Sequence, residues 1–157
     1  MPHLTLHSPL GEITVFEEDG RIVALDFGRG AGVAEATPLL ARARRQLDAY
    51  FDDPRSAFDL PLAPAGTAFQ RKVWDEMLAI PPGRTRRYGE IAAALGSSAR
   101  AVGGACGANP IPIIIPCHRV VGSGALGGYS GGEGADTKRY LLAHEHADAP
   151  LLAAPAH

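Results

Sequence analysis

The residues of this chain with the clearest chemical potential are a thiol, an imidazole and a guanidinium in direct succession, Cys117-His118-Arg119. A cysteine reacts as its thiolate, and neighbouring cations lower the free energy needed to form one. Three prolines within 109–116 restrict the preceding backbone to extended conformations, which favours a nucleophile held in a fixed position. The other cysteine, Cys106, lies among small residues of a helical segment, where a buried packing role is typical. Cys117 is therefore the predicted nucleophile, although many free cysteines are only small buried side chains.

The composition excludes several classes of protein. With 157 residues, 46% of them hydrophobic, the chain forms one domain or two small lobes that share a core. No apolar run approaches the roughly 18 residues that indicate a membrane span. The N-terminus lacks the basic and then apolar pattern of a secretory signal, and two free thiols are typical of a reducing compartment. We expect a cytoplasmic protein that does not associate with a membrane.

Charge is distributed unevenly along the chain. The net charge is −2, yet residues 67–119 carry seven Lys or Arg against three Asp or Glu. Such a basic zone on an acidic protein can bind phosphates while non-specific affinity stays modest. Ordinary arginine-rich surfaces have the same pattern, so charge alone leaves nucleic-acid binding open.

Hydrophobic periodicity predicts an α+β fold with two lobes, at 1–60 and 61–157. The first lobe combines a meander of short antiparallel strands with a helix that Thr37-Pro38 opens and residues 52–54 end. A linker at about 56–66 precedes the second lobe, in which helices are predicted at 67–80, 88–95, 99–107 and 135–144. The second and third of these helices, joined by a Gly-Ser turn, have helix-turn-helix proportions.

Two further patterns are better explained without a ligand. Gly122–Gly127 matches the Gly-x-Gly-x-x-Gly spacing of dinucleotide folds, but more glycines follow where a helix should begin, so a flexible loop that lines a pocket is the better interpretation. His144-Glu145-His146 lacks a third ligand at a recognisable spacing, so a metal site is not expected.

The run Pro116-Cys-His-Arg-Val120 resembles the signature of the 6-O-alkylguanine-DNA alkyltransferases, also called methylated-DNA–protein-cysteine methyltransferases. Further matches follow in family order at 67–74, 88–95, 100–105, 109–110, 128–130 and 141–145. The resemblance is strong over about 61–145 and weak over the N-terminal lobe, where only the order of strands and helix agrees. It implies a ribonuclease H-like first lobe and a stand-alone bacterial-type protein, without the extra regulatory domain of the larger adaptive-response fusions.

The resemblance also implies a reaction. Cys117 would attack the alkyl carbon on the 6-oxygen of guanine in DNA, and also on the 4-oxygen of thymine. His118 would take the thiol proton through a water, and Glu145 would stabilise the imidazolium. Asn109 would brace the loop, and Tyr88 would donate a hydrogen bond to the leaving guanine. Because the thioether has no easy hydrolysis route, each protein would repair one lesion, and no cofactor or metal is implied.

The expected partner is double-stranded DNA that contains alkylated guanine, bound by a monomer. The base must leave the stack, and Arg100 would fill the vacancy while its helix lies in the minor groove. The small residues of that helix would permit close approach to the DNA backbone; they are Ala101, Gly103 and Gly104. Other DNA contacts are expected from Thr67, Gln70, Tyr88 and Arg119. The flipped base would be held by Pro112, Val120, Tyr129 and Ser130.

Some alternatives remain open on the sequence. Arg87 stands where the family commonly has Thr or Ser, and it either adds a phosphate contact or changes docking on the duplex. His3 and His7 have no cysteine near them, so the zinc site of some relatives is not expected. A non-catalytic relative that only binds the lesion is the main rival, although such relatives replace the acceptor cysteine. A Cys-His hydrolase with turnover is a second rival, which leaves the helix-turn-helix residues unexplained.

Overall fold

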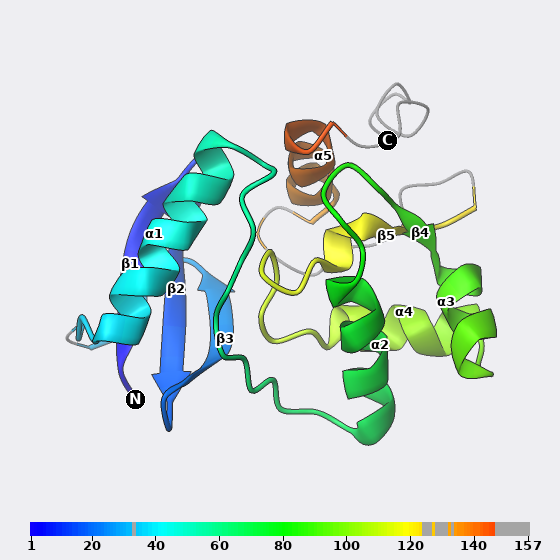
Figure 1. Ribbon diagram of the computed structural model, residues 1–157, viewed down its shortest axis with the longest axis horizontal. Helices are drawn as coiled ribbons and strands as arrows, with labels where there is room; N and C mark the ends of the chain where they lie inside the picture. Colours follow the sequence, from blue (N-terminus) through cyan, green and yellow to red (C-terminus); the bar gives the residue numbers. More distant parts are fainter. Residues whose placement is uncertain (33, 124–126, 128–131, 133, 147–157) are drawn as a thin grey trace. The chain divides into compact units, whose positions relative to one another are not determined.

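The computed structural model describes residues 1–32, 34–123, 127, 132 and 134–146, and the chain divides into two compact units (Figure 1). Unit 1 comprises Met1–Ala65 together with Pro110–Ile114, and unit 2 comprises Gly66–Asn109 and Ile115–His157. The predicted α+β class is confirmed. The segment Pro110–Ile114, shortly before the predicted nucleophile, belongs to unit 1 with the N-terminal residues. The predicted division at residue 60 did not include this return of the chain.

Unit 1 is built on a three-stranded antiparallel sheet in the order β1-β2-β3, which confirms the predicted meander. The strands are β1 (His3–Ser8), β2 (Gly11–Glu18) and β3 (Arg21–Phe27). Asp19 and Gly20 join β2 to β3 with φ values of 51° and 74°. Two positive φ angles in a two-residue loop match the right-handed twist of the flanking strands, so the Asp-Gly pair sets the register of this hairpin.

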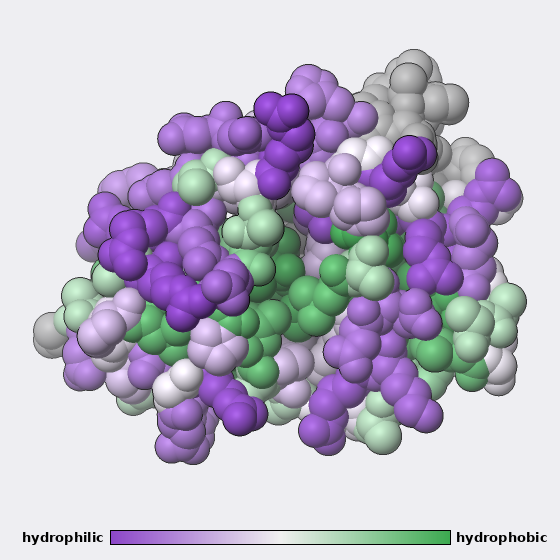
Figure 2. Space-filling view, viewed as in Figure 1, coloured by the Kyte–Doolittle hydropathy of each residue, from purple (hydrophilic) through white to green (hydrophobic). Residues whose placement is uncertain are grey.

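The helix α1 (Pro38–Asp52) packs against β1 and β2, as Figure 1 shows. Thr37 caps it, because its hydroxyl accepts the Leu40 N–H at 3.1 Å, and Pro38 occupies the first turn. Figure 2 shows hydrophilic residues over the outward side of α1. The helix and the sheet enclose the core of unit 1, which includes Leu6, Ile13, Val15, Leu25, Leu40, Leu47 and Tyr50.

Two segments distant in sequence bond to β3. Ile22 donates its N–H to the Pro61 carbonyl at 2.8 Å and accepts the Ala63 N–H at 2.9 Å, within a residue pairing of Ile22 with Leu62. Leu25 donates to the Pro110 carbonyl at 2.9 Å. The stretch predicted as a linker is thus partly an added edge of the sheet. The segment Pro110–Ile114 is anchored in the same way, through β3.

Unit 2 contains the helices α2 (Ala68–Leu78), α3 (Tyr88–Leu95), α4 (Ala99–Gly107) and α5 (Ala135–His144), close to the predicted ranges. Gly96 ends α3 with φ 64°, a left-handed conformation that glycine adopts without strain, and α4 begins three residues later. The indole N–H of Trp74 on α2 donates to the Ala105 carbonyl of α4 at 2.9 Å. This bond fixes the helix pair α3–α4 against α2.

A small parallel sheet connects the helix pair to the predicted nucleophile. β4 (Arg86–Arg87) pairs with β5 (Val120–Val121), so that Arg86 lies opposite Val120 and Arg87 opposite Val121. The 3-10 turn η1 (Cys117–Arg119) leads directly into β5, and β4 leads directly into α3. None of these three short elements was predicted, because two or three residues show no period. They place Tyr88 beside the strand that follows Cys117.

No helix among the described residues is long and apolar enough to span a bilayer.

Candidate functional site

Cys117 lies in a loop that a shared carbonyl holds in place. The Ile115 carbonyl accepts two hydrogen bonds of 2.8 Å, one from the Cys117 N–H and one from the side-chain amide of Asn109. The Arg119 N–H closes the turn on the Pro116 carbonyl at 3.0 Å. Cys117 is only 8% exposed, so a group that reacts with its sulfur must enter the protein surface to reach it.

A buried imidazole and carboxylate lie directly behind the nucleophile. His118 Nε2 is 2.7 Å from Glu145 Oε2, and both side chains are fully buried. His118 follows Cys117 on η1, whereas Glu145 is the residue that ends α5. The pair predicted across 27 positions of sequence is therefore in direct contact.

Arg119 completes this cluster from the other side. Its Nε donates to Glu145 Oε1 and its Nη2 to Glu145 Oε2, each at 2.9 Å, which is the two-pronged geometry that guanidinium groups favour. A third bond joins Nη1 to the Ile80 carbonyl at 2.6 Å. Arg119 is 7% exposed, and its donors are occupied inside unit 2. Arg119 is therefore placed to orient Glu145, and a DNA contact by its side chain stays a prediction.

Hydrogen bonds and burial together set the charge states of Glu145 and His118. Burial by itself raises the pKa of Glu145, but hydrogen bonds from His118 and Arg119 lower that pKa to about 2. Burial lowers the pKa of His118, against the opposing effect of Glu145. Near neutral pH, Glu145 is thus a carboxylate and His118 a neutral imidazole.

The direction of the His118–Glu145 bond leaves a base free. A carboxylate can only accept, so the imidazole proton is assigned to Nε2 and the lone pair to Nδ1. Among the described residues, Nδ1 of His118 is the only buried side-chain nitrogen or oxygen without a hydrogen-bond partner. A proton acceptor is therefore available on the residue next to the thiol.

A buried lysine that the sequence analysis missed lies on the other side of the site. Lys138 on α5 is completely buried, and its Nζ donates to the Val120 carbonyl at 2.7 Å and to the Tyr88 hydroxyl at 3.3 Å. The same Nζ is 5.5 Å from the centre of the Tyr88 ring. Burial lowers the pKa of Lys138 to about 8, while the charges of Cys117 and Cys106 act to raise it. An ammonium thus lies within electrostatic reach of the predicted nucleophile.

One signal in the sequence could have identified Lys138. The buried face of α5 consists of Thr137, Lys138, Leu141 and Leu142. Lys138 precedes Leu141 by three positions and Leu142 by four, which is the spacing of one helix face. A lysine on the apolar face of a helix is rarely tolerated without a specific partner.

The second cysteine, Cys106, is a poor nucleophile. Burial, and to a lesser degree the nearby Cys117, raise the pKa of Cys106 to about 12, against an opposing effect of Lys138. Cys106 therefore stays a neutral thiol at neutral pH. Of the two cysteines, only Cys117 has both a base and a loop that holds it in place.

The predicted DNA-contacting residues of α4 lie at the surface. Arg100 and Ala101 are exposed in its first turn, and Ser98 caps the helix by accepting the Ala101 N–H at 3.1 Å. A Cβ atom added to Gly103 or Gly104 would meet no atom within 4 Å. Within the described chain, Arg100 forms no ion pair. The helix thus presents a free guanidinium and a surface without bulky side chains.

The other predicted site residues are less closely associated. Thr67 and Gln70 cap α2 reciprocally, with bonds of 3.1 Å and 2.9 Å, and both retain exposed surface. Val120 is buried in β5, and Pro112 belongs to unit 1, where it is half-buried. Tyr129 and Ser130 lie outside the described residues.

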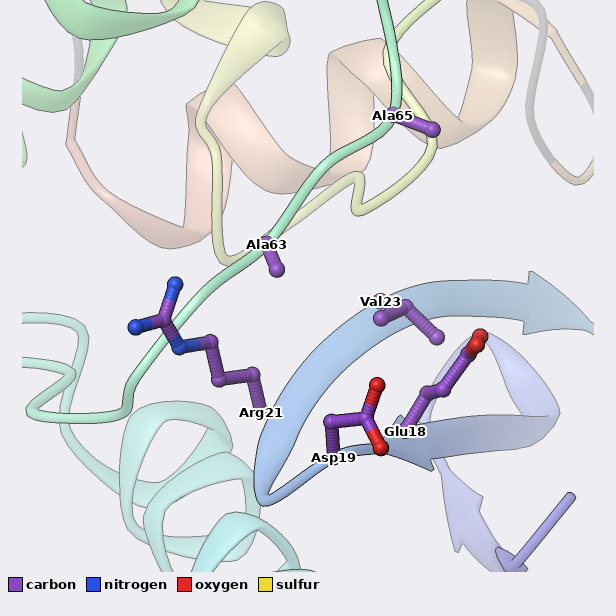
Figure 3. A pocket seen from close by; sticks show the side chains of 6 residues that line it. All are labelled: Glu18, Asp19, Arg21, Val23, Ala63 and Ala65. Atoms are coloured by element: carbon purple, nitrogen blue, oxygen red, sulfur yellow. The ribbon is translucent and has the colours of Figure 1, made fainter.

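A hollow in unit 1 offers no comparable chemistry. Figure 3 shows Glu18, Asp19 and Arg21 around the β2–β3 turn, with Ala63 and Ala65 on the segment that passes this end of the sheet. The hollow has a volume of about 480 Å³ and is completed by Val23. Its lining contains no thiol, imidazole or hydroxyl, so it is not the predicted reaction site.

Known proteins resemble the chain over nearly its whole length. Residues 1–64 match the family model "6-O-methylguanine DNA methyltransferase, ribonuclease-like domain", and residues 68–147 match "6-O-methylguanine DNA methyltransferase, DNA binding domain". The chain is 42% identical over 153 residues to the constitutive methylated-DNA–protein-cysteine methyltransferase of Bacillus subtilis, with 89% of this chain and 92% of that protein covered.

Two further relatives extend the comparison. A methylated-DNA–protein-cysteine methyltransferase of Methanosarcina barkeri is 45% identical over 147 residues, which cover 87% of this chain and 92% of the relative. The crystal structure of Mycobacterium tuberculosis OGT in complex with DNA matches with a TM-score of 0.82 at 42% identity, covering 96% of this chain and 97% of that chain.

Proposed function

The chain belongs to the 6-O-methylguanine DNA methyltransferase family, and we propose that Cys117 is the residue that receives the methyl group. Its activity is that of a methylated-DNA–protein-cysteine methyltransferase, the direct repair of O6-methylguanine. The assignment to Cys117 rests mainly on one observation: His118, the next residue, has an unpartnered Nδ1 and is held by the ionised Glu145.

The transfer is a direct displacement at carbon. A lone pair of the Cys117 sulfur forms the S–C bond while the bond between the methyl carbon and the guanine 6-oxygen breaks. The thiol proton passes to His118 Nδ1, through a water, and the resulting imidazolium is stabilised by the Glu145 carboxylate at 2.7 Å. The product is a thioether, which water does not readily cleave. Each molecule therefore acts once, and no cofactor enters the reaction.

Tyr88 and Lys138 assist the departure of guanine. An ammonium has donors only, so the Tyr88 oxygen must accept from Lys138 Nζ. In the reaction, the Tyr88 O–H donates to the base, whose negative charge grows as the C–O bond breaks. The same reasoning holds for alkyl groups on the 4-oxygen of thymine, which leave as a comparable anion. Lys138 also favours the thiolate electrostatically, since Cys117 and Lys138 influence each other's charge.

DNA binding is assigned to α3 and α4. The nearly buried thiol requires that the nucleotide leave the duplex, at a cost of roughly a few kcal/mol. The exposed Arg100 fills the vacated position, and the open surface at Gly103 and Gly104 allows α4 to approach the DNA backbone in the minor groove. The bound form is a monomer on double-stranded DNA, and the reaction takes place in the cytoplasm.

A stoichiometric alkylation assay tests this proposal. The protein is incubated with a duplex that contains one O6-methylguanine, and the intact mass is followed over time. A single gain of about 14 Da, mapped to Cys117 and absent in Cys117→Ala, is the expected result for transfer to this thiol. Binding without a mass change would favour the rival reading of a lesion-binding relative. More than one methyl group removed per protein would refute the single-use mechanism.

A further inference from the structure

Among the described residues, two of the seven cations in 67–119 are held by carboxylates of unit 2, and the others are exposed. Arg86 is half-buried and pairs with Glu76 at 2.9 Å, and Arg119 is held by Glu145. Of the seven cations in this segment, two are therefore neutralised within unit 2, and Arg71, Lys72, Arg84, Arg87 and Arg100 remain exposed. Of these five, Arg87 and Arg100 lie at the N-terminal ends of α3 and α4, Arg87 as the N-cap of α3 and Arg100 in the first turn of α4.

The β4–β5 pair sets the direction of Arg87. Successive side chains of a strand point to opposite faces. Arg86 is turned toward Glu76 on α2, so Arg87 faces the opposite way, where it is exposed and forms no ion pair within the described chain. Its own N–H donates to Glu90 at 2.9 Å, and the extended backbone has φ −85° and ψ 150°. The base of this side chain is thus fixed.

Arg87 also adjoins the site on two sides. It immediately precedes Tyr88, whose hydroxyl accepts from Lys138, and it lies opposite Val121 on the strand that follows Cys117 and its turn. Paired strands are about 4.8 Å apart. The eight residues of α3, which rise by about 12 Å, and the turn that follows lie between Arg87 and Arg100.

We propose that the Arg87 guanidinium binds a phosphate of the damaged strand beside the nucleotide that enters the Cys117 site. This inference rests on the proposed action on DNA. Arg100 acts within the base stack, whereas Arg87 holds the backbone at the other end of α3. The contact carries no base specificity, which suits a protein that must scan any sequence.

Salt dependence of binding to an undamaged duplex measures such a contact directly. Each phosphate contact contributes about 0.9 to the slope of log affinity against log salt concentration. Arg87→Thr should lower the slope by that amount, so the wild-type advantage is about 15-fold at 50 mM salt and about 4-fold at 200 mM. Arg87→Lys should keep the wild-type slope, because a point charge suffices for counterion release. Arg44→Thr, which removes an equally exposed charge from α1, should leave the slope unchanged.

Two further measurements locate the contact. Reaction of Arg87→Thr with free O6-benzylguanine should proceed at the wild-type rate, which shows that the fold and the site are intact. Replacing single phosphates by neutral methylphosphonates should reveal one position that weakens binding of the wild type and not of Arg87→Thr. An unchanged slope in Arg87→Thr, an equal loss in Arg44→Thr, or the absence of any such phosphate would overturn the inference. A wild type that neither binds DNA nor gains a methyl group would instead overturn the proposed function beneath it.

Discussion

Glu145→Gln should separate the electrostatic role of this carboxylate from its shape. The substitution removes the negative charge and replaces one of the two carboxylate oxygens, which accept from His118 at 2.7 Å and from two Arg119 donors at 2.9 Å, by an NH2 donor. The guanidinium then stays buried without its counter-charge, and breaking a buried ion pair in this way costs about 3–5 kcal/mol. For a chain of 157 residues we expect the melting temperature to fall by about 6–20 °C at neutral pH.

The pH dependence of the free energy of unfolding isolates the contribution of the Glu145 charge. The pKa of Glu145 falls from 4.5 to about 2 in the folded protein, which corresponds to about 3 kcal/mol of stabilisation. Because the folded pKa is the lower one, this stabilisation is present above pH 4.5 and is lost as pH falls toward 2. Between pH 5 and pH 3 the wild type should lose about 2 kcal/mol that Glu145→Gln does not lose.

Urea unfolding of both proteins at pH 5 and pH 3 measures this difference. Glu76→Gln is the matched control, since it breaks a half-exposed pair with Arg86 and should cost at most about 1 kcal/mol. Single-turnover methyl transfer at pH 7.5 should slow at least about 100-fold in Glu145→Gln, with DNA affinity retained, because the imidazolium loses its stabilising carboxylate. If Glu145→Gln lost as much stability as the wild type between pH 5 and pH 3, the assignment of the low pKa to this cluster would be wrong.

Three other substitutions test the remaining parts of the site. Gly104→Ala should raise the free energy of unfolding by about 1 kcal/mol, since the new methyl group meets no atom within 4 Å and alanine favours a helix. The same methyl group should weaken duplex binding, and an unchanged affinity in a fluorescence anisotropy titration would exclude α4 from the interface. Burial lowers the pKa of Lys138 to about 8, so the unfolded chain binds that proton more tightly than the folded one. The free energy of unfolding of the wild type should therefore rise by roughly 3 kcal/mol relative to that of Lys138→Met as pH rises from 8 to 10.5. Lys138→Met should also slow methyl transfer, and parallel stability curves for the two proteins would contradict the buried charge. Arg100→Ala should slow repair in a duplex far more than reaction with free O6-benzylguanine, because only the duplex requires the base to be extruded; equal losses in the two assays would exclude the intercalating role.

Local patterns predicted most of the regular structure. Thr37-Pro38 begins α1 and Thr67 begins α2, because a hydroxyl that accepts an N–H of the first turn needs only nearby residues. Gly96 ends α3 for a similarly local reason, its positive φ. Elements whose stability depends on distant segments were missed, among them the two-residue strands of the β4–β5 pair and the bond from Leu25 to Pro110.

The same division applies to the candidate site. Cys117, His118 and Glu145 were identified through motifs, and their contact confirms nothing about their roles, which remain proposals. The contact of Arg119 with Glu145 was not predicted, because a basic residue in a basic segment gives no sign of being turned inward. Lys138 was missed because its burial depends on how α5 packs. In both cases the relevant information lies in tertiary contacts and not in residue type.

The charges buried around Cys117 have unequal partners, and this inequality bears on the chemistry. The carboxylate of Glu145 forms a buried ion pair with the guanidinium of Arg119. Two acceptors of Lys138 Nζ, the Val120 carbonyl and the Tyr88 hydroxyl, are neutral groups. A negative charge on Cys117 therefore offsets part of the desolvation of the Lys138 ammonium, as the opposing effects on the pKa of Lys138 indicate. We infer that the Lys138 ammonium favours a thiolate at Cys117, the state proposed to attack carbon, and that a thioether on Cys117 would remove that negative charge permanently.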